Sequence, residues 1–426
     1  MHMLCRQSRL SGSVEIPGSK SHTIRAVAVA SLADGVSRIE APLLSADTLA
    51  AVDAYRALGA GIEMGDNEWR ITGFAGKPRI PDNVIDVRNS GTTMRIVMGS
   101  CTLLEQGLTV LTGDEQIRRR PMAALAKSLN ELGAIITSTR GNWMAPLVVA
   151  GKLRGGQTTI EAVTSQFVTS LLFCTPLAEK DTEIDVPLLN EKPYVQITLD
   201  WLERTGIRVE HEAMRRFHVP GGQAFRPVDV RVPADFSSAT FFLCAGVLGD
   251  NDILVRGLDM NDAQGDKAVV DYLRRMGAKI EITNDGIRVQ PGNLTGCEID
   301  MNATPDALPM MAVVGCFARG RTALVNVPQA RMKETDRIAV MCAELGKMGA
   351  KVEEKPDGLI IEESPLRAAE VEGHFDHRVV MALAVAGTAV TGETRITTAE
   401  AVEVTFPTFI PYMTNLGGDL CIHAEP

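Results

Sequence analysis

The chain has 426 residues, a formal net charge of −10 and a hydrophobic content of 45%. This length is too great for one ordinary core and suits two domains of about 200 residues each. The acidic balance argues against a nucleic-acid surface, and apolar runs of about a dozen residues are too short to span a membrane.

The cysteines and histidines indicate a reduced protein without a metal. The eight cysteines form no C-x-x-C pair and lie mostly in apolar stretches, which is typical of reduced core thiols. The seven histidines are scattered without the spacing of metal ligands, and no secretory signal precedes the first strand. We therefore expect a cytoplasmic protein with no metal and no cofactor.

The first informative segment in chain order is IPGSKSHTIR, from Ile16 to Arg25. A β-like run ends there and a helix opens with hydroxyls and with the cations Lys20 and Arg25. Free backbone N–H groups and the partial positive charge of a helix start favour phosphate or carboxylate. A Pro-Gly turn with a Ser N-cap and a solvated lysine is the alternative interpretation.

A helix that ends in glycine and is followed by a strand recurs six times, at intervals of 68 to 74 residues. A fixed period of this length indicates repeated supersecondary units, and glycine suits a helix end that needs a left-handed backbone. The six glycines are Gly59, Gly133, Gly206, Gly277, Gly349 and Gly417.

One copy predicts a βαβαββ unit, with a tight Asn-Asp-Gly turn in its final hairpin. Its predicted elements are a strand at Val230 to Val232, a helix from Ser237 to Leu248, a strand at Ile253 to Leu258, a helix from Gln264 to Met276, and strands at Lys279 to Thr283 and Ile287 to Gln290.

The first helix of each copy begins with polar residues. If three copies pack about one axis in each domain, these helix starts face a shared space that attracts a polyanionic small molecule. Six ordinary N-caps are the alternative, and the favoured one for the fourth copy. The six starts are Ser19 to Ser21, Asn89 to Thr93, Thr164 to Gln166, Phe236 to Ser238, Thr304 to Asp306 and Asp376 to Arg378.

The densest functional signal is the segment from Arg331 to Arg337. Lys333 and Arg337 are four residues apart, so we expect them to share a helix face, with Glu334 three residues before Arg337. A solvated helix with salt bridges is the alternative for an isolated K-E-x-x-R pattern. Arginine suits two-pronged binding of carboxylate and phosphate. Further single arginines stand at other predicted helix starts, namely Arg95, Arg120 and Arg378.

Eight motifs occur in a characteristic order along essentially the whole chain: PGSKSHTIR, NSGTTMR, LTGDEQIRRRP, TSQF, KPYVQITL, MKETDR, DHR and TFPTF. By these motifs the chain resembles the enolpyruvyl transferase family, in its branch of 5-enolpyruvylshikimate-3-phosphate synthases. Members of this branch join phosphoenolpyruvate to shikimate 3-phosphate in aromatic amino-acid biosynthesis.

The resemblance implies an α/β fold, a two-domain inside-out α/β barrel with three βαβαββ units in each domain. The chain would cross between the domains near Pro17-Gly18 and near Pro233-Ala234. One domain would therefore comprise residues 1–17 and 234–426, and the other residues 18–233. The active site would lie in the cleft between them, and the domains would close on substrate. We expect a monomer whose partners are these two small molecules.

The resemblance also implies the reaction and the residues that perform it. The enolpyruvyl group passes to the 5-hydroxyl through a non-covalent tetrahedral intermediate, which needs a base, an acid for carbon and cations for phosphate. Asp306 matches the base for the hydroxyl, Glu334 the proposed proton donor to the methylene carbon, and Lys20 a catalytic cation. Gly91 has a further reason, since a side chain there would block the approach of a ligand to the backbone.

Binding residues are implied for each substrate. Those for shikimate 3-phosphate are Lys20, Ser21, Arg25, Thr164, Ser165, Gln166, Asp306, Gln329 and Lys333. Those for phosphoenolpyruvate are Lys20, Gly91, Arg120, Gln166, Arg337 and Arg378.

Four positions depart from the family pattern and leave the acceptor open. Val404 replaces a common lysine, Glu191 a common serine, Arg88 a common glycine, and Gln329 a common asparagine. One alternative is the sister enzyme that uses UDP-N-acetylglucosamine, which is disfavoured because no cysteine lies between Leu111 and Arg120. Another is a transferase for a different phosphorylated polyol.

Two alternatives belong to other functional classes. A nucleic-acid clamp built from α/β repeats would need basic stripes, which an acidic chain with single functional cations lacks. A pseudoenzyme that keeps only the fold is disfavoured because Lys20, Asp306, Lys333 and Glu334 are all present.

Overall fold

The computed structural model describes residues 1–424, and its contacts divide the chain into two compact units. The first, which we call the terminal unit, joins Met1–Pro17 to the chain from Ala234 onward. The second, the inner unit, is Gly18–Pro233. Each unit is described separately below.

The inner unit alternates strands and helices. Its strands are β3 (Val36–Glu40), β4 (Gly61–Met64), β5 (Glu68–Thr72), β6 (Ile85–Asp86), β7 (Leu108–Thr112), β8 (Ile135–Ser138), β9 (Leu147–Ala150), β10 (Gly156–Ala162), β11 (Thr182–Leu189), β12 (Glu210–Glu212), β13 (Arg216–Val219) and β14 (Asp229–Arg231). Its helices are α1 (Lys20–Leu32), α2 (Ala46–Ala57), α3 (Gly91–Cys101), α4 (Ala123–Glu131), α5 (Ser165–Cys174) and α6 (Lys192–Arg204), with short 3-10 turns η1 (Ile117–Arg119) and η2 (Thr175–Leu177).

The terminal unit has the same alternation. Its strands are β1 (His2–Arg6), β2 (Ser11–Glu15), β15 (Asp252–Arg256), β16 (Lys279–Thr283), β17 (Gly286–Gln290), β18 (Glu298–Asp300), β19 (Arg321–Val325), β20 (Lys351–Lys355), β21 (Gly358–Glu362), β22 (Glu370–Glu372), β23 (Glu393–Thr397) and β24 (Asp419–His423). Its helices are α7 (Phe236–Ala245), α8 (Val269–Met276), α9 (Leu308–Phe317), α10 (Arg337–Lys347), α11 (His377–Thr388) and α12 (Phe409–Asn415), with 3-10 turns η3 (Gly265–Ala268), η4 (Pro305–Ala307), η5 (Pro328–Met332) and η6 (Ala399–Val404).

Within the described residues the strands form six four-stranded sheets, three in each unit. In the sheet β10-β11-β13-β12, for example, the first two strands are parallel and the remaining pairs are antiparallel. The other sheets keep this pattern. The prediction of an α/β fold built from six βαβαββ units is therefore confirmed.

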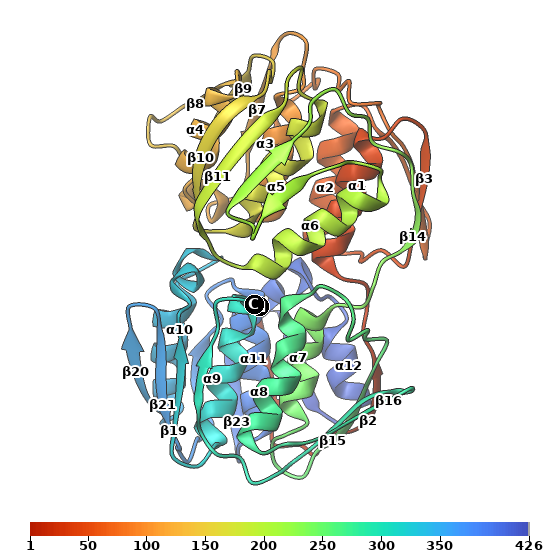
Figure 1. Cartoon of the computed structure of the whole chain (residues 1–426). Helices are drawn as coiled ribbons and strands as arrows, with labels where there is room; N and C mark the ends of the chain where they lie inside the picture. Colours follow the sequence, from red (N-terminus) through yellow and green to blue (C-terminus); the bar gives the residue numbers. More distant parts are fainter. Residues whose placement is uncertain (425–426) are drawn as a thin grey trace. The chain divides into compact units, whose positions relative to one another are not determined.

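The helices form the inside of each unit and the sheets its outside, as Figure 1 shows for α1, α3 and α5 against β3 and β7. Every residue of α3 is buried, and so is every residue of α7 and of α11. These helices are buried on all sides because their sequences are apolar or small all round. By contrast, α8 and α10 bury one face only. This inside-out arrangement gathers the starts of buried helices.

The repeated glycines end their helices as predicted. All six have positive φ angles, between +78° for Gly206 and +111° for Gly59. In the fourth copy Gly277 directly follows α8, and a Cβ there would lie 2.6 Å from the carbonyl oxygen of Asn293. Glycine is required there for both its backbone angle and its lack of a side chain.

One predicted strand belongs to a different sheet. The strand near Val230, assigned from the sequence to the fourth copy, is β14 and pairs with β3 of the inner unit, with Asp229 opposite Arg38. The fourth copy instead takes β2, whose Ser11 lies opposite Asp252 of β15. The sequence pattern misses this exchange because the paired strands are about 190 and 240 residues apart.

The first strand of the chain lies where the sequence predicts. β1 pairs with both β23 and β24, so it completes a sheet of the terminal unit. In the same unit the helix predicted from Gln264 to Met276 is divided into η3 and α8. Among the described residues, no helix has both the length and the apolar character that crossing a membrane requires.

Candidate active site

The predicted polar helix starts are N-caps in the structure. The side chains of Ser90, Thr164, Asp235 and Asp376 accept hydrogen bonds from backbone N–H groups at the starts of α3, α5, α7 and α11. Such caps satisfy donors that have no partner within the helix. They also leave further N–H groups and partial positive charge for an anion.

Lys20 is the first residue of α1, and its Nζ lies 3.1 Å from Oδ2 of Asp47 in the first turn of α2. Both side chains are largely buried. Asp47 was not predicted, because an acidic residue in a helix's first turn is common and carries no further signal.

Arg25 lies one turn into α1 and is 1% exposed. Its guanidinium donates hydrogen bonds to Oγ1 of Thr198 at 3.0 Å, to the carbonyl of Ser21 at 3.0 Å and to the carbonyl of Tyr194 at 3.1 Å. Burial lowers the pKa of Arg25 to about 10, so the side chain stays charged at neutral pH. A buried cation with neutral partners suits an anionic ligand or an anionic neighbour.

Gly91 begins α3 and makes room for two arginines. A Cβ there would lie 2.2 Å from Nη1 of Arg120 and 2.8 Å from Nη1 of Arg95. Arg95 donates to Oε1 of Gln166 at 2.5 Å, and Gln166 donates to Oγ1 of Thr92 at 2.9 Å. The reason for glycine differs from the predicted one, because arginine side chains occupy the space expected for a ligand.

The start of α5 holds a carboxylate from the chain itself. Oε2 of Glu191 accepts hydrogen bonds from Oγ1 of Thr164 at 3.1 Å and from both N and Oγ of Ser165, at 3.1 and 2.8 Å. Glu191 is the N-cap residue of α6 and has a left-handed backbone, with φ of 58°. One residue that departs from the family pattern thus lies against the predicted phosphate-binding motif.

In the terminal unit three carboxylates surround Arg337, which is 1% exposed. Its guanidinium donates to Asp376 at 2.8 Å, to Asp306 at 2.7 Å and to Glu334 at 2.6 Å. Burial alone would lower the pKa of Arg337, but the three carboxylates outweigh it and raise that pKa above its ordinary value. The two predicted proton-transfer residues, Asp306 and Glu334, therefore bind one guanidinium.

Asp306 lies in η4 immediately before α9 and meets three cations. Arg337 contacts its Oδ1 at 2.7 Å, Nζ of Lys333 lies 3.9 Å from the same oxygen, and Arg378 of α11 lies 3.1 Å from Oδ2. The starts of α9, α10 and α11 thus converge on one carboxylate, as expected if the helix starts of a unit share a space.

The predicted helix face shared by Lys333 and Arg337 is wrong. Asp336 caps α10 by accepting the N–H of Ala339, so the helix begins at Arg337 and leaves Lys333 and Glu334 in the preceding loop. Lys333 and Arg337 still meet, because both reach Asp306.

The helix start predicted at Arg120 is also wrong. Arg120 follows η1, and α4 begins only at Ala123. The intervening Pro121 disfavours helical geometry at the residue before it.

Asp266 was missed by the sequence reasoning. It is buried in η3, and Oγ of Ser237 donates a hydrogen bond to it. Burial, reinforced by the charge of Asp306, raises the pKa of Asp266 to about 7. From the sequence it is one acidic residue among 53, and only its surroundings distinguish it.

Comparison with known proteins decides the family. The family model of EPSP synthase (3-phosphoshikimate 1-carboxyvinyltransferase) matches residues 4–413. The chain belongs to the EPSP synthase family.

Similar proteins of full length support this assignment. The chain is 52% identical to the 3-phosphoshikimate 1-carboxyvinyltransferase of Acetivibrio thermocellus and 50% identical to that of Ruminiclostridium cellulolyticum, with 99% of each chain covered in both comparisons. A solved structure of EPSP synthase from Acinetobacter baumannii matches with a TM-score of 0.84 and 27% identity, covering 99% of this chain and all of that one.

The other departures from the pattern of EPSP synthases lie in separate places. Gln329 is buried and donates to the carbonyl of Asn302 at 2.9 Å. Arg88 has a φ of 53°, which explains why glycine is common there, and its Nη2 lies 2.6 Å from Asp53 of α2. Val404 ends η6.

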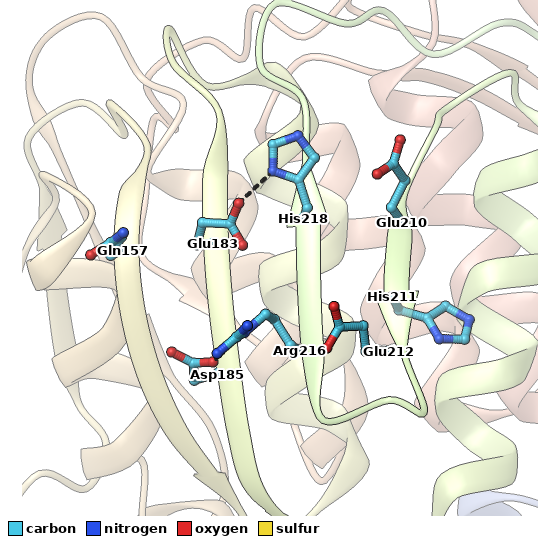
Figure 2. A pocket seen from close by; sticks show the side chains of 8 residues that line it. All are labelled: Gln157, Glu183, Asp185, Glu210, His211, Glu212, Arg216 and His218. Carbon is cyan, nitrogen blue, oxygen red and sulfur yellow. Dashed lines mark hydrogen bonds and ion pairs between the residues drawn. The ribbon is translucent and has the colours of Figure 1, made fainter.

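A polar hollow on the outer face of the sheet β10-β11-β13-β12 includes none of the site residues that the family resemblance implies (Figure 2). Its charged side chains pair with one another: His218 with Glu183 at 2.6 Å and Arg216 with Asp185 at 3.0 Å. In the described part of the chain no group of acidic, histidine or cysteine side chains has the arrangement of a metal site. The hollow therefore offers no rival to the helix-start clusters.

Proposed function

We propose that the helix-start clusters of the two units together carry out the 3-phosphoshikimate 1-carboxyvinyltransferase reaction, a step of the shikimate pathway to aromatic amino acids. The enolpyruvyl group of phosphoenolpyruvate passes to the 5-hydroxyl of shikimate 3-phosphate, and phosphate leaves from a non-covalent tetrahedral intermediate. Membership in the EPSP synthase family and the identity of about one half to full-length relatives support this activity.

The observation that carries the mechanism is the shared contact of Asp306 and Glu334 with Arg337. The reaction needs a base for the hydroxyl and an acid for the methylene carbon close together. We assign Asp306 to the hydroxyl proton and Glu334 to the carbon. Lys333, 3.9 Å from Asp306, is placed to bind the same hydroxyl.

Arg337 also offers a way to ready Glu334 for proton transfer. An ion pair favours the charged form of a carboxyl group, whereas a proton donor must be neutral. The carboxylate or phosphate of phosphoenolpyruvate would compete with Glu334 for the guanidinium of Arg337. Binding of this substrate would thereby release Glu334 to carry a proton.

The anionic groups of the substrates require cations and helix starts from both units. We assign phosphoenolpyruvate to Lys20, Gly91, Arg120, Gln166, Arg337 and Arg378. We assign shikimate 3-phosphate to Lys20, Ser21, Arg25, Thr164, Ser165, Gln166, Asp306, Gln329 and Lys333. Because each set includes residues of both units, we propose that the units close on the substrates.

A phosphate-release assay tests this function. We expect release only when phosphoenolpyruvate and shikimate 3-phosphate are both present. UDP-N-acetylglucosamine in place of shikimate 3-phosphate should give none. Release with UDP-N-acetylglucosamine and none with shikimate 3-phosphate would contradict the assigned acceptor.

A cytoplasmic location and a monomeric state are proposals of the same kind. All eight cysteines lie within the described residues and are free thiols, which supports a reducing compartment. Sedimentation velocity would check the monomer.

A further inference from the structure

Glu191 occupies the place where the family resemblance implies that the phosphate of shikimate 3-phosphate binds. Its carboxylate accepts three hydrogen bonds at the start of α5, from Thr164 and Ser165, and the residue is only 2% exposed. A helix start with free N–H groups and hydroxyls favours an anion. Here the anion is part of the chain.

The backbone around Glu191 holds it in this position. Asn190, just before it, donates its backbone N–H to the carbonyl of Ala162 at 3.1 Å and its side-chain amide to the carbonyl of Val163 at 3.2 Å. Glu191 itself adopts a left-handed conformation that non-glycine residues rarely adopt. The neighbouring contacts thus maintain a strained residue whose carboxylate reaches α5.

We propose that Glu191 is an internal competitor of the acceptor's phosphate and determines how tightly this enzyme binds phosphorylated acceptors. The inference rests on the proposed function and deepens it. Phosphate and the Glu191 carboxylate cannot accept the same hydrogen bonds from Thr164 and Ser165 at once. Like charges at that distance also repel. Binding of the phosphate therefore exchanges bonds already made, and the Glu191 side chain must move away.

The exchange still favours the substrate. A phosphate monoester carries a charge of about −1.5 to −2 and three acceptor oxygens, more than a single carboxylate offers. The charged Arg25, whose pKa Glu191 raises although burial dominates it, lies in the same unit. Glu191 would thus reduce the affinity for a phosphorylated acceptor without abolishing it.

Calorimetry on two variants tests the proposal. Glu191→Gln removes the charge and keeps the shape, and Glu191→Ser removes both. With shikimate 3-phosphate alone, we expect binding at least about tenfold tighter for Glu191→Ser and a smaller gain for Glu191→Gln. Binding of unphosphorylated shikimate should be the same in all proteins. Glu203→Gln is the matched control, since it removes an exposed carboxylate near the other end of α6.

Unchanged or weaker binding of shikimate 3-phosphate in both variants would overturn the proposal. Thermal unfolding with inorganic phosphate gives a second readout. Both variants should lose stability, because the start of α5 loses its anion, and phosphate should restore more of the melting temperature in them than it adds to the wild type. Equal gains in all proteins would again contradict the competitor role.

The phosphate-release assay on the wild type separates this inference from the proposed function. Turnover by the wild type with unchanged affinity in the Glu191 variants would reject the inference alone. If the wild type shows no turnover with shikimate 3-phosphate, the function is rejected, and the thermal experiment with inorganic phosphate still decides the role of Glu191.

Discussion

Asp306 and Glu334 reach the same guanidinium from different segments, one from η4 and one from the loop before α10. We predict that Asp306→Asn and Glu334→Gln each lower kcat by roughly two to four orders of magnitude, with modest changes in KM, because positioned proton-transfer groups act mainly in the transition state. Steady-state kinetics with both substrates would measure this.

Asp271→Asn provides the control for these carboxylate variants, since Asp271 lies on α8 with a side chain that is 69% exposed. Its kcat should match that of the wild type. Near-normal turnover in both Asp306→Asn and Glu334→Gln would refute the assigned roles.

Val404 stands where many relatives of the resembled branch have a lysine. If that cation is simply lost, Val404→Lys should lower KM for phosphoenolpyruvate about ten- to a hundredfold, since a charge-assisted hydrogen bond is worth roughly 1.5 to 3 kcal/mol. The KM for shikimate 3-phosphate should hardly change. Arg88 has its own partner, Asp53 at 2.6 Å, which favours simple loss over a relocated charge.

Kinetics of Val404→Lys alone and with Arg88→Gly distinguishes the two explanations. Improvement in the single variant supports simple loss, and improvement only in the double variant supports a charge relocated to Arg88. No effect in either would mean that position 404 does not face the substrate.

Asp266 predicts how the stability of the terminal unit depends on pH. Its pKa is about 7 in the folded chain against 3.8 ordinarily, so between these values the folded state binds more protons than the unfolded state. Stability should therefore fall as pH rises from 4 to 7 and beyond. The charges that face Asp266 are Asp306 and Asp235, which raise its pKa, and Arg378, which lowers it.

Asp266→Asn should remove that fall. We expect its free energy of unfolding in urea to decline less between pH 5 and pH 8 than that of the wild type, by up to about 4 kcal/mol. Asp271→Asn is again the control and should follow the wild type. Parallel pH profiles for wild type and Asp266→Asn would contradict this assignment.

At the scale of elements, the repeat depends on helix ends that only glycine can form. At Gly277 a side chain would meet both a φ of +103° and the carbonyl of Asn293 at 2.6 Å. We predict that Gly277→Ala lowers the free energy of unfolding by more than about 1 kcal/mol.

Gly346→Ala is the matched control within α10. A Cβ there would meet nothing within 4 Å, and its backbone is helical. This substitution should stabilise the chain slightly, by roughly 0.5 to 1 kcal/mol, because alanine favours a helix. Destabilisation of both variants to the same degree would show that the backbone angle at Gly277 is not the cause.

At the scale of the molecule, the proposed substrate contacts are divided between two units joined by two chain crossings. We predict that shikimate 3-phosphate lowers the radius of gyration measured by small-angle X-ray scattering, because its contacts with both units favour a closed form. Unphosphorylated shikimate at the same concentration should have less effect. An unchanged radius, with binding shown by calorimetry, would contradict domain closure.

The sequence by itself determined the number and type of the repeats, the helix caps and the glycine ends, because each depends on residues within a few positions of one another. Ser90, Thr164 and Asp376 act as N-caps as their positions predict. The family motifs also selected Asp306, Glu334 and Arg337, which the structure brings into contact.

Only the tertiary structure decided which distant groups meet. The exchange of β2 and β14 between sheets depends on backbone pairing across about 190 and 240 residues. The contact of Glu191 with Ser165 and the burial of Asp266 beside Asp306 likewise depend on packing. Hydrogen bonds and charges act through space, so the local pattern that predicts a helix start cannot show which anion fills it.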